Sequence, residues 1–292
     1  MPVLSSGLTV EAPAKVNLAL HVTGRRADGY HCLDSWVAFT ELGDRLRLDD
    51  AEADSLDCTG PFAGDVPPGA DNHVFRALAL FRQAFPEAPS ARRFYRITLD
   101  KHLPVASGLG GGTGNGAAML RALAHLGGID LDAPELAALA LKIGADGPMC
   151  LKSRSARAEG IGEVLTPFSL PELDLVLVNP GVAVETPPVF RALRCRENPP
   201  LAAFDPDEDC IGQLAGARND LCEPAMSVAP EIGTVLGALQ AAPGVRLARM
   251  SGSGATCFAI VQKESAAKDL AARLKFEHPD WWVEATRTRS GG

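Results

Sequence analysis

Residues 104–114 have the sequence Pro104-Val105-Ala106-Ser107-Gly108-Leu109-Gly110-Gly111-Gly112-Thr113-Gly114. A strand-like segment precedes this glycine-rich loop, and a helix-like segment follows it. Glycines let the backbone approach an anion closely, and the start of a helix offers unpaired N–H groups and the positive end of its dipole. Thr113 adds a hydroxyl where a phosphate or its metal would lie. The loop therefore predicts a polyphosphate site, with every residue of 104–114 as a candidate nucleotide ligand.

Three other interpretations of the glycine-rich loop fit the sequence less well than a polyphosphate site. An idle connection would have to order six glycines between residues 107 and 116, at a high cost in backbone entropy. A P-loop is excluded because the chain holds no Gly-Lys pair. Gly112, Gly114 and Ala117 match a dinucleotide fingerprint, but no strand–helix–strand unit with an acidic strand end follows. A dinucleotide-binding oxidoreductase stays open as a weak alternative that predicts tight binding of NAD.

Length and composition narrow the class of protein. A chain of 292 residues predicts about two domains, and 46% hydrophobic with 22% charged residues is typical of a globular protein. The net charge of 28 − 36 = −8 argues against nucleic acid as a partner. No apolar run could span a bilayer and no signal segment follows Met1, so no membrane partner is expected. Seven scattered cysteines predict reduced thiols and a cytoplasmic location.

Hydrophobic periodicity predicts α+β structure in the first half of the chain. Alternation over 16–22 and 95–99 predicts strands, and shorter strands are expected over 36–39 and 46–48. Helical spacing over 72–85 predicts a helix with Asp71 or Asn72 as its N-cap. A second helix is expected after the glycine segment 107–116 and ends at Gly127 and Gly128. A third is expected to be capped by Asp132 and to end before Gly144.

The second half is also predicted to be α+β. Strands are expected over 175–178, 245–250, 256–261 and 281–286. Helices are expected over 186–193, 232–239 and 264–275, with a polar loop over 196–209. Glycines and prolines cluster between residues 160 and 171, so a boundary is placed between an N-terminal domain, 1–165, and a C-terminal domain, 166–292.

Three motifs together give the chain a resemblance to a known family. They are Pro13-Ala14-Lys15-Val16-Asn17-Leu18, the glycine-rich loop, and Ser251-Gly252-Ser253-Gly254-Ala255. The chain resembles the GHMP small-molecule kinases in these motifs and in their order. The resemblance implies a two-domain α+β fold: an N-terminal nucleotide-binding domain like ribosomal protein S5 domain 2 and a C-terminal ferredoxin-like α/β sandwich. It also implies a site in the cleft between the domains.

Further motifs are similar to one branch of that family, which acts on 4-diphosphocytidyl-2-C-methyl-D-erythritol. They are Gly24-Arg25-Arg26-Ala27-Asp28-Gly29-Tyr30-His31, Gly144-Ala145-Asp146, Glu159-Gly160-Ile161-Gly162-Glu163, Asn179-Pro180-Gly181 with Thr186-Pro187, and Asn219-Asp220-Leu221. The resemblance implies ATP-dependent phosphorylation of a 2-hydroxyl in non-mevalonate isoprenoid synthesis, on a small substrate with a cytidine diphosphate group. It also implies Mg²⁺ held mainly by ATP phosphates and water, with no protein ligand assigned.

The resemblance assigns roles residue by residue. Lys15 and Asp146 are the expected catalytic residues: the aspartate orients the acceptor hydroxyl or accepts its proton, and the lysine stabilises charge. Tyr30, His31 and Phe190 are expected to hold the cytosine by stacking and hydrogen bonding. The remaining expectations are Asn17, Gly252 and Ser253 at the substrate, and Asn72 and Lys101 at the adenine.

The chain departs from the family pattern at two places. Thr113-Gly114-Asn115-Gly116 stands where the family has two serines and then Asn-Ala. Gly147 precedes Pro148 where the family has a valine. Two alternatives stay open beside the main expectation: a GHMP kinase for mevalonate-type, homoserine or sugar substrates, and a non-catalytic relative that binds ATP.

Overall fold

The computed structural model describes residues 7–289, except for the side chain of Ala70. The chain forms two compact units that are not consecutive in sequence. The first comprises residues up to Ala14, Gly43–Val105 and Gly110–Ser153, and the second comprises Lys15–Leu42, Ala106–Leu109 and the chain from Arg154 onward. Both units mix helices and strands, as predicted. The domain boundary placed between 165 and 166 stays a prediction.

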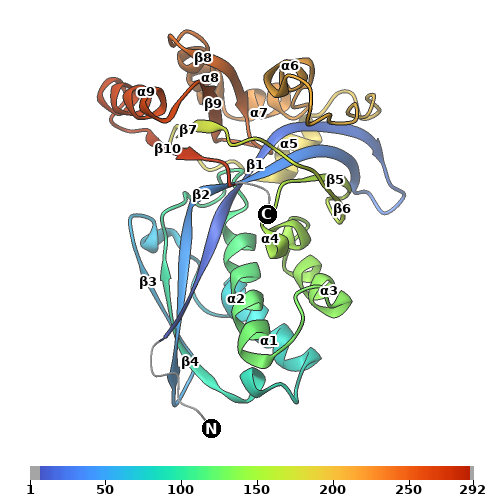
Figure 1. Cartoon of the computed structure of the whole chain (residues 1–292), viewed down its shortest axis with the longest axis vertical. Coiled ribbons are helices and arrows are strands. Elements are labelled where there is room, and N and C mark those ends of the chain that lie inside the picture. Colours follow the sequence, from blue (N-terminus) through green and yellow to red (C-terminus); the bar gives the residue numbers. More distant parts are fainter. Residues whose placement is uncertain (1–6, 290–292) are drawn as a thin grey trace. The chain divides into compact units, whose positions relative to one another are not determined.

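In the first unit, helices cover strands that share one core. Residues 45–51 of β2 (His31–Ala51) pair antiparallel with β4 (Phe94–Asp100), and β3 (Ser55–Thr59) pairs parallel with β4. The helices lie to one side of β3 and β4 (Figure 1). They are α1 (His73–Ala84), α2 (Gly111–Gly127), α3 (Pro134–Ile143) and α4 (Gly147–Lys152), with short 3-10 turns at Ala63–Asp65, Gly69–Asp71 and Pro89–Arg92. Tyr95, Ile97 and Leu99 point into this core, which confirms the predicted alternation.

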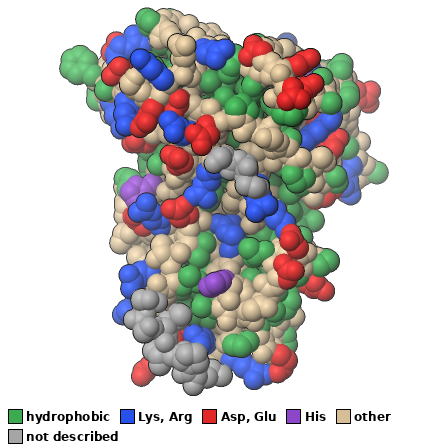
Figure 2. Space-filling view, viewed as in Figure 1, with side chains coloured by type: hydrophobic (Ala, Val, Ile, Leu, Met, Phe, Trp, Pro, Cys, Tyr) green, Lys and Arg blue, Asp and Glu red, His purple; other side chains and the backbone are tan. Residues whose placement is uncertain are grey.

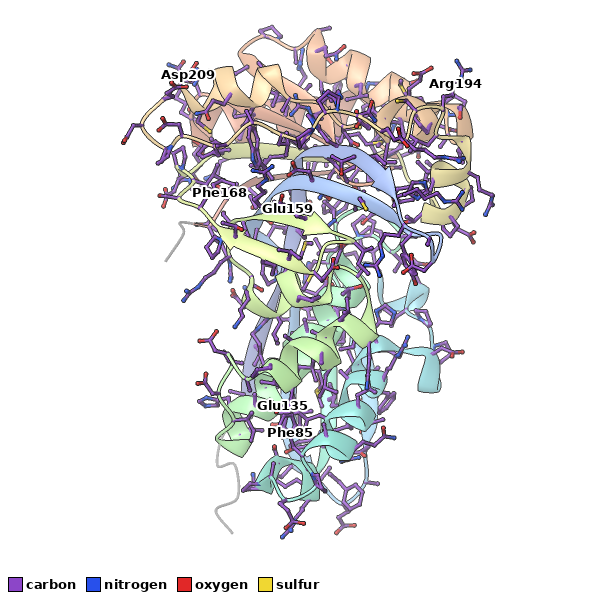
Figure 3. All side chains as sticks on the ribbon, turned by 90° about the vertical axis from the view of Figure 1, so that its right-hand side faces the viewer. Phe85, Glu135, Glu159, Phe168, Arg194 and Asp209 are labelled. Atoms are coloured by element: carbon purple, nitrogen blue, oxygen red, sulfur yellow. The ribbon has the colours of Figure 1, made fainter. Side chains whose placement is uncertain are left out.

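Helix α1 begins and ends as its sequence predicts. The Asn72 side chain accepts a hydrogen bond from the N–H of Val74 at 2.8 Å, so Asn72 and not Asp71 is the N-cap. Phe85 follows the last turn (Figure 3), and its ring packs against that of Phe81 with centroids 5.0 Å apart. Both ends of the helix are therefore fixed, one by a polar cap and the other by aromatic packing.

Three predictions about elements in this half are corrected. Helix α2 begins at Gly111, inside the glycine segment, and ends at Gly127 with Gly128 as its C-cap, as expected. Asp132 does not cap α3: its N–H donates to Asp130, and the helix starts at Pro134, whose fixed φ suits a first helical residue. Glu135 then lies in the first turn, where a negative charge complements the dipole (Figure 3). The two short strands expected over 36–39 and 46–48 belong to one long strand, β2.

The second unit contains parts of the first sheet and all of a second one. β1 (Leu8–Arg25) pairs with β2, whose residues 33–37 pair antiparallel with β5 (Ala156–Gly160). β5 pairs antiparallel with β6 (Val164–Pro167), so the strand order of this sheet is β3-β4-β2-β5-β6. The second sheet is antiparallel in the order β10-β7-β9-β8. Its strands are β7 (Asp174–Asn179), β8 (Val245–Met250), β9 (Cys257–Val261) and β10 (Trp282–Arg287).

Helices of the second unit pack on that antiparallel sheet. They are α5 (Thr186–Ala192), α6 (Cys210–Gly216), α7 (Cys222–Val228), α8 (Glu231–Gln240) and α9 (Glu264–Glu277). Leu236 and Leu239 of α8 and Leu270 and Leu274 of α9 enter one core with the sheet. This arrangement agrees with the predicted α/β sandwich. Helix α6, which the periodicity does not predict, begins after Asp209, whose carboxylate accepts from two N–H groups (Figure 3).

The surface carries mixed charge. Acidic and basic side chains are interspersed over the face seen in Figure 2. Within residues 7–289, no helix is both long enough and apolar enough to pass through a bilayer.

Candidate active site

The candidate site residues are divided between the two units. The second unit contains Ala106–Leu109 of the glycine-rich loop together with Lys15, Asn17, Tyr30, His31, Phe190, Gly252 and Ser253. The first unit contains the rest of the loop together with Asn72, Lys101 and Asp146. Each group is described within its own unit.

The glycine-rich loop has an unusual backbone. Ala106, Gly108 and Gly110 have φ values of 51°, 78° and 69°, so every second residue is left-handed. Such alternation turns successive N–H groups toward one side, as in anion-binding nests. A side chain at Gly108 would place its Cβ 2.5 Å from the carbonyl oxygen of Ser251, so only glycine fits there. The loop geometry therefore supports the predicted anion site.

Two further features of the loop suit a nucleotide. Ser107 is buried, and within residues 7–289 its hydroxyl has no hydrogen-bond partner. Gly110 occupies the N-cap of α2 without a side chain to cap the first turn, whose N–H groups have no intrahelical acceptors. Buried polar groups are normally paired, so these donors are suited to a ligand.

Lys15 and Asn17 lie on the same face of β1, two residues apart, and both side chains are buried. The Lys15 ammonium donates to the amide oxygen of Asn17 at 2.7 Å. The Asn17 amide nitrogen in turn donates to the hydroxyl of Ser35 on β2 at 2.8 Å. The predicted catalytic lysine and the predicted substrate ligand are thus directly hydrogen-bonded.

Hydrogen bonds join all three sequence motifs in the second unit. The Ser251 hydroxyl accepts from the N–H of Asn17 and donates to the carbonyl oxygen of Gly108, both at 3.1 Å. Thr256 adds a second link, because its N–H donates to the carbonyl oxygen of Ser107 at 3.1 Å. The lysine segment, the glycine-rich loop and the turn after β8 therefore form one connected assembly. Sequence reasoning named Gly252 and Ser253 of this turn as site residues but gave no role to Ser251, which makes the links.

Asn219 holds the turn between β8 and β9. Its amide nitrogen donates to the carbonyl oxygens of Met250 at 2.8 Å and Gly252 at 2.9 Å, and its amide oxygen accepts from the N–H of Leu221. Ser253, in the same turn, hydrogen-bonds the hydroxyl of Thr186 at 3.0 Å. Asn219 belongs to a family motif in the sequence, but its role in holding this turn is visible only in the structure.

The three predicted cytosine residues differ in their surroundings. The rings of His31 and Phe190 stack with centroids 4.7 Å apart at 22°, whereas Tyr30 is 58% exposed. Nε2 of His31 is buried and, within residues 7–289, has no hydrogen-bond partner. Burial lowers the pKa of His31, and the charges of Arg196 and Arg25 lower it further. A neutral imidazole has one donor and one acceptor, which suits the polar edge of a base.

Lys101, in the first unit, forms a buried ion pair. Its ammonium lies 2.5 Å from the carboxylate of Asp44, which also accepts from the N–H groups of His102 at 2.8 Å and Leu103 at 2.9 Å. Burial lowers the pKa of Lys101, and the charge of Asp44 acts in the opposite direction. A Cβ at Gly111 would lie 3.1 Å from the ammonium, so the pair is beside the start of α2. Sequence reasoning missed Asp44.

Asn72 uses its whole side chain at the start of α1. The amide oxygen caps the helix, and the amide nitrogen donates to the carbonyl oxygen of Pro67 at 3.0 Å. Its predicted place at the adenine, like that of Lys101, stays a prediction.

Asp146 directly precedes α4 in a tightly packed turn of the first unit. A Cβ at Gly147 would lie 1.8 Å from the carbonyl oxygen of Ala140, and one at Gly144 would lie 2.7 Å from the hydroxyl of Thr113. The valine typical of the family therefore cannot be accommodated at position 147 without moving α3. This close approach explains one of the two sequence departures.

Gly116 accounts for one part of the other departure, the loss of the family's alanine. A Cβ at this residue would lie 2.9 Å from Ile143 and 3.0 Å from the carbonyl oxygen of His73. Helices α1, α2 and α3 are thus packed too closely here for the alanine that the family has at this position. Within residues 7–289, no group of three or more His, Cys, Asp or Glu side chains is placed to hold a metal ion.

Comparison with known proteins identifies the family to which the chain belongs. The model for the GHMP kinases N terminal domain matches residues 72–153, and the model for the GHMP kinases C terminal matches residues 179–280. Crystal structures of a homoserine kinase from Cytophaga hutchinsonii, at 17% identity and a TM-score of 0.65, and of a Methanococcus jannaschii mevalonate kinase, at 13% and 0.67, share the fold.

Relatives with higher sequence identity are described as kinases of one particular substrate. A 4-diphosphocytidyl-2-C-methyl-D-erythritol kinase of Cereibacter sphaeroides is 51% identical over 94% of this chain and 97% of its own. One from Rhizobium etli is 47% identical over 98% and 96%. A crystal structure of a 4-(cytidine 5'-diphospho)-2C-methyl-D-erythritol kinase, 36% identical, covers 98% of this chain and all of its own with a TM-score of 0.79. This chain belongs to the GHMP kinase family, within its group of 4-diphosphocytidyl-2-C-methyl-D-erythritol kinases.

Proposed function

We propose that this chain transfers the γ-phosphoryl group of ATP to the 2-hydroxyl of 4-diphosphocytidyl-2-C-methyl-D-erythritol, giving the 2-phosphate and ADP. The reaction is a step in non-mevalonate isoprenoid precursor synthesis. The observation that carries the proposal is the likeness of about half of all residues, over nearly the whole chain, to kinases described by that reaction. The cytoplasm is the proposed compartment, and cell fractionation tests it.

The proposed mechanism relies on positioning and charge, which are the main tasks of a protein in phosphoryl transfer. The left-handed residues of the glycine-rich loop and the first turn of α2 bind the ATP phosphates through backbone N–H groups. Bound together with ATP, Mg²⁺ would supply positive charge that neutralises the phosphates. As a hard cation it would take most of its ligands from phosphate oxygens and water, with no protein ligand assigned.

Lys15 and Asp146 are the proposed catalytic residues. Asp146 orients the 2-hydroxyl and accepts its proton as the oxygen bonds to the γ-phosphorus and the bond to ADP breaks. The Lys15 ammonium stabilises the negative charge on the transferring group. Support comes from the anchoring of Lys15, which Asn17 joins to the glycine-rich loop and to the turn after β8.

The proposed cytosine site uses the aromatic residues of the second unit. The base stacks on exposed Tyr30 and on the ring of Phe190, and His31 hydrogen-bonds the base edge through Nε2. Ser253 and the backbone at Gly252 contact the remainder of the substrate. This arrangement favours a cytidine-containing substrate over a smaller alcohol.

The test is ADP release by the purified protein with ATP, Mg²⁺ and one alcohol at a time, with the product identified by phosphorus NMR. We expect turnover with 4-diphosphocytidyl-2-C-methyl-D-erythritol and none above background with mevalonate, homoserine or galactose. Turnover with one of the smaller alcohols instead would replace the proposed substrate. ATP binding without turnover on any of them would point to a non-catalytic relative.

A further inference from the structure

The amide of Asn17 has two chemically different ends, and the hydrogen bonds around it fix which end faces which neighbour. Ser35 lies opposite it on β2, is buried, and donates its only hydroxyl proton to the carbonyl oxygen of Ala19 at 2.6 Å. Toward Asn17, the Ser35 oxygen can therefore only accept. The NH₂ end of Asn17 must face Ser35, as the 2.8 Å contact has it.

The opposite end of the amide is then committed to Lys15. With its NH₂ group on Ser35, Asn17 presents its carbonyl oxygen to the Lys15 ammonium, which donates to it at 2.7 Å. The reversed amide would set NH₂ against NH₃⁺, two donors with no acceptor between them. Gly252 lies close to the same oxygen, because a Cβ at Gly252 would lie 3.2 Å from it. These hydrogen bonds therefore connect the ammonium of Lys15 to the carbonyl of Ala19 with only one possible assignment of the Asn17 amide.

We propose that Ser35 is a positioning residue for the phosphoryl transfer: it locks the orientation of the Asn17 amide and so fixes the place of the Lys15 ammonium. This inference rests on the proposed function for its kinetic readout. Ser35 need not touch either substrate, since its effect passes through Asn17. An ammonium displaced by a fraction of an ångström stabilises a transition state less while leaving ground-state binding nearly intact.

The first test is Ser35→Ala, assayed beside the parent enzyme with ATP and the cytidine substrate. We expect kcat to fall about tenfold or more, with both KM values within about twofold of the parent. Ser35→Thr, which keeps a hydroxyl that can accept and donate, should restore most of kcat. Equal falls in kcat with Ala and Thr, or a change confined to KM, would overturn the proposal.

The matched control is Ser90→Ala. Ser90, in the first unit, is a buried serine whose hydroxyl donates to the carbonyl oxygen of Leu123 at 2.8 Å, the same kind of bond as that from Ser35 to Ala19. Its loss should lower the melting temperature without changing kcat. If Ser90→Ala and Ser35→Ala lower kcat alike at equal loss of stability, the effect of Ser35 is structural and the proposal fails.

A double-mutant cycle tests the route through Asn17. If Ser35 acts only by orienting this amide, Ser35→Ala should change kcat by less than about twofold once Asn17→Ala is present. Multiplied effects would contradict the proposal. Should Ser35→Ala not fold, Ser35→Cys carries the same test, because a thiol of similar size is a weak donor and acceptor. Absence of turnover in the parent would instead reject the proposed function, so the two failures are distinguishable.

Discussion

Lys101 and Lys15 are both buried, and the molecule holds them in different ways. Lys101 lies against the carboxylate of Asp44, which is itself fully buried and also binds two backbone N–H groups. Lys15 donates to the neutral amide of Asn17, at the start of a chain of hydrogen bonds through Ser35 to a backbone carbonyl. The Asp44 carboxylate neutralises the Lys101 ammonium, and the amide oxygen of Asn17 orients the Lys15 ammonium.

The two lysines also connect different parts of the molecule. The pair of Lys101 and Asp44 ties β2, which carries Asp44, to the residues that directly follow β4, next to the first residue of α2. Its charges are largely satisfied by each other, and breaking such a pair is expensive. Lys15 is anchored to the residues that carry the glycine-rich loop and the turn after β8. We therefore expect changes at Lys101 to affect mainly stability and changes at Lys15 to affect mainly kcat.

The largest effect should come from Lys15→Met, which removes the ammonium and keeps most of the apolar stem. We expect kcat to fall by about 10²–10³-fold, because a positioned charge on the transferring group is lost. The melting temperature should change little, because Met keeps most of the packing of the buried stem. Steady-state kinetics and thermal unfolding on the same preparation check this. A normal kcat, or a fall explained by unfolding, would break the comparison.

The next largest effect is on stability, at the other lysine. Asp44→Ala leaves a buried ammonium and two backbone N–H groups without their acceptor, and should lower the free energy of unfolding by about 3–5 kcal/mol. Lys101→Met should cost less, because Asp44 keeps its two backbone donors. Urea unfolding measures both losses. A larger loss from Lys101→Met than from Asp44→Ala would show that the carboxylate is not the centre of this cluster.

The smallest effect concerns pH and sharpens the role of His31. Because burial and two nearby arginines lower the pKa of His31 below its ordinary value of 6.5, the ring stays neutral at pH 7. Affinity for the cytidine substrate should fall only at a pH below 6.5, as the ring gains a proton. His31→Gln should abolish this acid-side change and leave ATP affinity unaltered. A midpoint above 6.5 in binding titrations would contradict the assignment.

The lowered pKa of His31 also makes the stability of the folded chain depend on pH. Between the lowered pKa and 6.5 the unfolded chain binds a proton at His31 that the folded chain does not. The contribution of His31 to stability is therefore present above pH 6.5 and is lost as the pH falls through this window. Unfolding of the parent and of His31→Gln, compared across that range, measures the difference.

Much of the fold was predictable because its signals are local. The alternation at Tyr95, Ile97 and Leu99 reports a half-buried strand, and Asn72 ahead of an apolar period reports a helix start. Failures arose where tertiary packing overrides local preference. The glycines at 111–116 lower helix propensity, yet α2 includes them. At Gly116 the packing of α1 and α3 leaves no room for a side chain, which no local pattern reveals. Asp132 resembles a cap, but Pro134 sets the start of α3.

The site residues also fall into those that a local motif predicts and those that only the fold reveals. Motif order predicts Lys15, the glycine-rich loop and the Ser251–Ala255 turn, because residue types in a fixed order carry that information. No local pattern distinguishes Ser35, Asp44 or Ser251 from other serines and aspartates. Their partners are distant in sequence: Ser251 bonds Asn17 and Gly108, and Asp44 bonds Lys101. Such residues are identified only once the fold has brought their partners together.

The most direct test of the proposed kinase compares the parent with Asp146→Asn, in ADP release with 4-diphosphocytidyl-2-C-methyl-D-erythritol and in calorimetric binding of a non-hydrolysable ATP analogue. Asparagine keeps the size of the side chain and loses its ability to accept the proton. We predict turnover in the parent, a loss of about 10²-fold or more in the variant, and equal binding of the analogue by both. Near-parental turnover by Asp146→Asn would contradict the proposed mechanism.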